Sequence, residues 1–211
     1  MAYSTRMAAA LSGATTAQLK NWRNDRGNGP VLRPELASNP ALYSFRDVLA
    51  LRAFAQLRRT VSLQKIRKAL TTLKGFGEVE HLSSYRLVAE GDSVVLVDDD
   101  DHGTDLVRRP GQRVIATLGD ILAEFAPRPG VVVPHLLHPK QHVSVDPATQ
   151  GGQPVIAGTR VPFDVVADLL LSGVPAEEVE EYYPGVTAQA ARDAASFALY
   201  VDSYAPGERA A

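Results

Sequence analysis

Apolar and polar positions near the start of the chain follow the spacing of two short helices. The apolar positions, each three or four residues from another on the same face, are Met7, Ala8, Leu11, Leu19 and Trp22. Gly13 lies between the two helices and permits a sharp turn, and Thr15 or Thr16 can cap the second helix. The pattern predicts a helix-turn-helix whose second helix enters a DNA groove. An ordinary amphipathic helix pair has the same pattern, so a further observation must decide between them.

The charge distribution favours DNA. Residues 1–74 contain 13 Lys and Arg but only 3 Asp and Glu, and the whole-chain totals of 22 and 24 leave 9 basic and 21 acidic residues for the remainder. The two parts therefore carry net charges of +10 and −12. A basic folded segment neutralises phosphates and releases their counterions. The candidate DNA contacts in and beside the second helix are Thr15, Thr16, Gln18, Lys20, Asn21, Arg23 and Arg26.

The next segments predict a wing and two more helices. Residues 25–40 are rich in Gly, Asn and Pro, which is typical of a loop or short hairpin. Helical spacing then returns at Phe45, with Ser44 as the expected N-cap and Asp47 three residues further on. A second helical pattern covers residues 61–73. We expect a winged helix-turn-helix over residues 1–74.

Beyond this part, the pattern predicts small β elements followed by a helical region. The expected middle elements are a hairpin of residues 85–89 and 93–97, a strand at 113–117 and a short helix at 118–125. Two short strands then lead into three helices, which start near Pro162, after Pro175 and at Thr187. In the second of these helices, Val179 and Tyr182 are expected to point inward and four glutamates outward.

The chain is therefore predicted to be mainly α with small β elements, an α+β arrangement. Its expected divisions are a DNA-binding domain (1–74), a β-rich linker or scaffold (75–139), a helical domain like a three-helix helix-turn-helix (140–204) and a flexible tail (205–211). The two folded domains are each long enough to bury a modest core.

The first third of the chain resembles the winged-helix DNA-binding domain of the MerR family. The resemblance rests on residues 19–23, 42–48 and 61–66. By position, Lys20 corresponds to an arginine of that family's recognition helix, and Tyr43 and Ser44 correspond to a pair that meets the phosphate backbone. Arg46 is the last of the residues expected to contact DNA. The chain departs from the family at Ala41, where an arginine is common, and at residues 75–77, where glycines end the pattern before any long dimerisation helix.

A second resemblance covers about 60 residues of the acidic part. The motif at residues 152–162, with Gly158, Thr159, Arg160 and Pro162, closely resembles a small helical domain of unknown function found in bacterial antitoxin-like proteins. Together with a DNA-binding domain, the arrangement resembles VapB-type antitoxins, including mycobacterial examples, that pair with PIN-domain ribonuclease toxins. The resemblance implies autorepression of an operon, which calls for a homodimer on paired half-sites, and neutralisation of a toxin.

The roles of individual residues in this second domain stay open. Thr159 can be a helix cap and Arg160 can be tied to backbone carbonyls or to Asp146, which would make the motif architectural; direct contact with a partner is the alternative. Arg192 and Arg209 are candidates for occupying a toxin's carboxylate-lined active site.

Other chemistry is sparse. The chain has no cysteine, no phosphate-binding glycine loop and no nucleophile elbow, so we expect neither an enzyme nor a cofactor. Three histidines (His135, His138 and His142) and the acidic run at 98–101 are more typical of surface loops than of metal sites.

The setting expected from the sequence is the cytoplasm. The N-terminus lacks a secretory core, and no apolar run approaches the length of a membrane helix. The alternative function is a one-component regulator whose acidic domain senses a small ligand, which would call for a sizeable apolar pocket.

Overall fold

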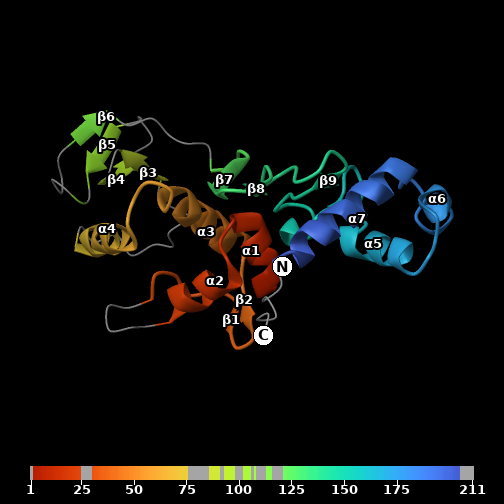
Figure 1. The fold of residues 1–211 in the computed structure, drawn as a ribbon, viewed down its shortest axis with the longest axis horizontal. Coiled ribbons are helices and arrows are strands. Elements are labelled where there is room, and N and C mark those ends of the chain that lie inside the picture. The colour runs from red at the N-terminus through yellow and green to blue at the C-terminus, as the bar shows by residue number, and fades with distance from the viewer. Residues whose placement is uncertain are drawn as a thin grey trace.

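The fold is mainly α with small antiparallel β elements, which confirms the predicted class. A computed structural model describes residues 2–24, 30–75, 86–90, 93–97, 102–105, 107, 113–115 and 121–204. The first elements are α1 (Thr5–Ser12), α2 (Thr16–Arg23), β1 (Ala37–Ser38), β2 (Ala41–Leu42), α3 (Phe45–Leu57) and α4 (Leu63–Gly75). In Figure 1, α4 lies at one end of an elongated molecule, and α1 and α3 lie near its middle.

The turn between α1 and α2 depends on Gly13. This residue ends α1 with a φ of +78°, in the left-handed region that side chains disfavour. A Cβ at this position would also lie 2.6 Å from Cγ2 of Val133. Gly13 therefore allows both the sharp turn and the close approach of a distant hairpin.

Capping residues define the starts of α2 and α3 as the sequence predicts. Thr15 caps α2 and Ser44 caps α3, each in a reciprocal capping box with the residue three positions further on, Gln18 or Asp47. The expected wing is a hairpin in which β1 and β2 pair antiparallel with only two residues each.

One buried arginine joins α3 to a remote segment. Arg52 is fully buried, and its guanidinium donates hydrogen bonds of 2.5–3.2 Å to the backbone carbonyls of Leu11, Ile121, Leu122, Ala123 and Pro134. Its guanidinium carbon also lies 5.0 Å from the centre of the Phe125 ring. These contacts attach residues 121–134 to the N-terminal helices, so the predicted linker contributes to their core.

The middle region forms a four-stranded antiparallel sheet and a separate hairpin. The sheet contains β3 (Arg86–Glu90), β4 (Ser93–Val97), β5 (His102–Asp105) and β6 (Arg113–Ile115), paired in chain order. The predicted hairpin and last strand are confirmed, and β5 is additional. The predicted helix at 118–125 is wrong in its described part, because residues 121–124 are irregular and β7 (Phe125–Arg128) pairs with β8 (Val131–Val133). Residues 98–101 lie outside the described residues.

The C-terminal part follows its prediction closely. It contains β9 (Val143–Ser144), the 3-10 turn η2 (Gln150–Gly152), β10 (Val155–Ile156), α5 (Phe163–Leu171), the 3-10 turn η3 (Ala176–Glu178), α6 (Val179–Tyr182) and α7 (Ala188–Asp202). The prediction for Tyr182 is wrong: its side chain is 55% exposed, whereas Val179 is buried. The 3-10 start and the four-residue length of α6 leave the next residue, Tyr183, to pack against the core instead.

Both ends of the chain share one hydrophobic core. The hydroxyl of Tyr200 on α7 donates to the carbonyl of Ala10 on α1 at 2.9 Å, and the Tyr3 hydroxyl donates to the carbonyl of Gly152. Burial raises the pKa of both tyrosines, so both hydroxyls remain donors. None of the helices in the described ranges combines the length and apolar character that a membrane span requires.

Candidate nucleic-acid interface

The second helix of the helix-turn-helix is anchored through the two side chains predicted to face inward. Leu19 and Trp22 are buried, and the Trp22 ring lies 6.0 Å from that of Phe54 on α3. The Trp22 carbonyl accepts hydrogen bonds from the backbone N–H groups of Val31 and Leu32. The helix is therefore fixed both by apolar packing and by the chain that follows it.

The opposite face of α2 presents polar and basic side chains to solvent. Lys20 and Asn21 are exposed, whereas Thr16 and Arg23 are half-buried. Among the described residues, Lys20 makes no hydrogen bond or ion pair, so its ammonium group is available to a phosphate or a base edge. Arg26 lies outside the described residues.

Thr15 and Gln18, which are two of the residues predicted to contact DNA, form the N-terminal capping box of α2. The Thr15 hydroxyl accepts from the Gln18 backbone at 3.1 Å, and the Gln18 side-chain oxygen accepts from the Thr15 backbone at 2.8 Å. Reading a base through that oxygen would break the capping box. Lys20, Asn21 and Arg23 are consequently the better candidates for contact with DNA.

Tyr43 was expected to contact the phosphate backbone, but it is buried in the core. It is 1% exposed, and its backbone forms an antiparallel bridge with Tyr3. Burial raises its pKa, although Arg23 lies close enough to oppose this effect. Its hydroxyl has no hydrogen-bond partner of good geometry among the described residues. Tyr43 is therefore part of the core and not of a DNA-binding surface.

An unexpected carboxylate occupies the start of α3, where phosphate was expected. The Ser44 hydroxyl accepts from the Asp47 backbone and donates to Oε2 of Glu35 at 2.6 Å. Arg46 lies 3.5 Å from Oε1 of Glu35 in an ion pair. Ser44 and Arg46 thus both contact Glu35, whose charge would repel a phosphate, but the Arg46 side chain is more than half exposed, so its contact with DNA stays a prediction.

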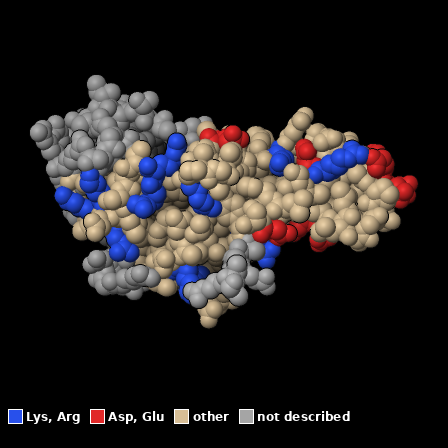
Figure 2. Space-filling model, viewed as in Figure 1, with Lys and Arg blue, Asp and Glu red and all other residues tan. Residues whose placement is uncertain are grey.

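Further basic residues, which the sequence-based site missed, lie on the loop after α3 and on α4. These are Arg58, Arg59, Lys65, Arg67 and Lys68. Figure 2 shows several groups of Lys and Arg over the part of the molecule that holds α2 and α4, and Asp and Glu at the end that holds α5 and α6, where some Lys and Arg also lie. The dense basic count of residues 1–74 was the available signal, but it could not place individual side chains. The basic surface therefore extends beyond α2.

In the motif at residues 158–162, Thr159 makes contacts within the fold, whereas Arg160 lies on the surface. The Thr159 hydroxyl donates to the Ile156 carbonyl at 2.9 Å and accepts from the Val161 backbone N–H at 3.0 Å, so it stabilises the turn before α5 but does not cap that helix, whose N-cap is Pro162. Gly158 adopts a φ of +78°, and Pro162 immediately precedes α5. Arg160 is exposed and makes no hydrogen bond or ion pair with the described residues, so it is not tied to backbone carbonyls or to Asp146.

The histidines do not form a metal centre in the described part of the chain. His135 and His138 stack with ring centres 5.7 Å apart, whereas His142 Nδ1 lies 2.7 Å from Oδ2 of Asp193. Burial raises the pKa of Asp193, but hydrogen bonds from His142 and Gln189 outweigh this effect and hold it below its ordinary value. This pair attaches α7 to the start of the C-terminal part.

Of the two arginines predicted to contact a toxin, the structure describes only Arg192. Arg192 pairs with Glu177, and both side chains are more than half exposed. Arg209 lies outside the described residues.

Comparisons with known proteins give a match of part of the chain to a family and a similarity of fold to solved structures. Residues 143–198, from β9 into α7, match the family described as protein of unknown function DUF433. No curated protein matches the chain. The crystal structure of Rv2018 from Mycobacterium tuberculosis is similar, with a TM-score of 0.51, 17% identity, and coverage of 92% of this chain and 96% of that chain. At this identity, the likeness concerns the fold alone.

Proposed function

We propose that the chain is a cytoplasmic DNA-binding antitoxin that represses its own operon as a homodimer and neutralises a PIN-domain ribonuclease toxin. The observation that carries the DNA-binding part is the exposed basic side of α2, presented by a helix-turn-helix with a short wing. Lys20, Asn21 and Arg23 contact the operator, and basic residues near α4 contact flanking phosphates.

The acidic C-terminal part supplies the surface for the toxin. Residues 140–204 contain nine Asp and Glu but three Lys and Arg. These carboxylates keep this part away from the phosphate backbone, so one chain can hold DNA and a protein partner at opposite ends. Four of them, the exposed glutamates of η3 and α6, lie at the end of the molecule remote from α4 (Figure 2).

The test is co-expression with the protein encoded next to this chain, with a tag on this chain alone. The neighbour should copurify without nuclease activity and regain that activity after it is stripped from the complex. A neighbour that neither binds nor cleaves RNA would contradict the antitoxin role. Ligand-dependent operator affinity without a protein partner would instead favour the one-component regulator.

A further inference from the structure

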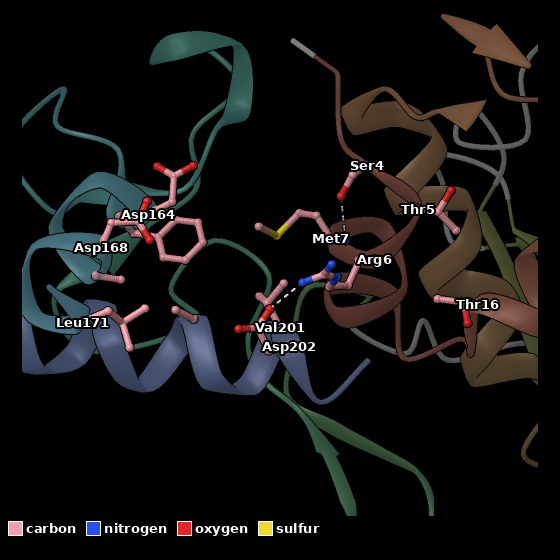
Figure 3. Close-up of a pocket in the computed structure, with 13 residues that line it drawn as sticks. Ser4, Thr5, Arg6, Met7, Thr16, Asp164, Asp168, Leu171, Val201 and Asp202 are labelled. Carbon is pink, nitrogen blue, oxygen red and sulfur yellow. Dashed lines mark hydrogen bonds and ion pairs between the residues drawn. The ribbon is translucent and has the colours of Figure 1, made fainter. Parts of the chain in front are cut away.

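A groove of about 500 Å³ lies between α1, α5 and α7. Its apolar surface includes Met7, Phe163, Ala167, Ala198 and Val201. Figure 3 shows the Met7 side chain extending from α1 towards α5, with Asp164 and Asp168 on the opposite side. The groove thus joins the helix-turn-helix to the C-terminal helices, and Thr16 at the start of α2 also borders it.

The charged residues around this groove are predominantly acidic. Arg6 and Asp202 pair with each other at 2.6 Å. Asp164 and Asp168 are exposed, and neither has a cationic partner among the described residues. Leu171, which also lines the groove, is 74% exposed. An occupant that matches these features needs both apolar side chains and positive charge.

We propose that this groove docks a helix of a partner protein that is apolar on one face and carries Lys or Arg one turn apart along its flank. Asp164 and Asp168 are four residues apart on α5, so they are separated by about 6 Å along its axis. Two basic residues four apart on a docked helix have the same separation, and its apolar side chains cover Met7 and Leu171.

The shape of the groove and the packing of this chain favour a partner helix over two other occupants. The groove is partly open to solvent, so it buries less of a small molecule than the enclosed sites that such ligands prefer. A second copy of this chain does not supply a matching helix from α2 or α4, because these basic helices already bury apolar residues such as Trp22 and Ile66. The identification of the partner as the toxin rests on the proposed function. The apolar and basic character of the docked helix rests on the groove alone.

The test uses the full chain and a fluorescein-labelled synthetic helix of leucine and lysine at helical spacing, with fluorescence anisotropy as the readout. The variant Asp164→Lys/Asp168→Lys should weaken binding by at least about tenfold, because like charges then face each other across the groove. The control Glu124→Lys reverses an exposed carboxylate that lies neither in the groove nor in the acidic C-terminal part, and should change affinity by less than about twofold.

Two further measurements separate groove binding from general attraction or a folding defect. Leu171→Ser, at an exposed position, should also weaken binding, and replacing lysine by glutamate in the peptide should abolish it. Equal weakening by both charge-reversed variants, or unchanged binding in Leu171→Ser, would overturn the proposal. Because the peptide assay requires neither operator DNA nor the neighbouring protein, its failure is distinct from a failure of the proposed function.

Discussion

Replacing Arg52 with methionine should destabilise the whole protein. Methionine fills a similar length of apolar space but removes the donors to five backbone carbonyls from two remote segments. A buried carbonyl left without a donor costs about 1–3 kcal/mol. Removal of a buried charge offsets part of that cost. We expect Arg52→Met to lower the free energy of unfolding by about 3–5 kcal/mol, a large share of the ~5–15 kcal/mol typical of a folded protein.

Urea unfolding followed by the single tryptophan measures this effect. Trp22 packs against Phe54 on the same helix as Arg52, so its fluorescence reports on the affected core. Arg52→Lys keeps the charge but loses the planar guanidinium with its several N–H donors. Its free energy of unfolding should therefore lie between those of the wild type and Arg52→Met. The control Arg59→Met changes an exposed arginine and should stay within about 0.5 kcal/mol of wild type. A loss below about 1 kcal/mol in Arg52→Met would refute the assigned role of this side chain.

Two other substitutions test local features of the fold. Gly13→Ala should lower the free energy of unfolding by about 2–4 kcal/mol, because it adds a clash with Val133 to the strain of a left-handed backbone. The control Gly158→Ala has the same φ but open space around its Cβ, and should lower it by about 1 kcal/mol. Equal losses in the two variants would argue against the clash. Asp193→Asn should cost about 1–2 kcal/mol at pH 7. Because the folded-state pKa of Asp193 is lowered, its stabilisation is present above the unfolded pKa and is lost as pH falls through the folded pKa. The difference between wild type and Asp193→Asn should therefore vanish in acid, and a difference that persists at low pH would contradict the His142 contact.

Local sequence signals predicted the elements well. The capping boxes at Thr15 and Ser44 and the apolar spacing of Leu19 and Trp22 each involve residues within four positions of one another. Such patterns depend on helix geometry alone, so they do not require knowledge of the tertiary fold.

The site was less predictable because its decisive contacts are remote in sequence. Glu35 reaches Ser44 only after the wing has folded back, and Tyr43 is buried by its bridge to Tyr3. The buried Arg52 itself had a detectable signal, because it lies four residues after Val48 and three before Ala55, on an otherwise apolar face of its helix. Its carbonyl partners, which are Leu11 and four residues between 121 and 134, had none, because they are remote from Arg52 in the sequence.

The central claim, that α2 reads DNA, is tested most directly by titrating the full chain onto the DNA upstream of its own gene at several salt concentrations. Lys20→Ala and Arg23→Ala should each weaken binding by about 1–3 kcal/mol if a base is read, or lower the salt dependence by about one unit if only a phosphate is touched. Arg160→Ala removes the same charge from the acidic part and should bind as wild type does. Wild-type affinity and salt dependence in both α2 variants would contradict DNA recognition by this helix.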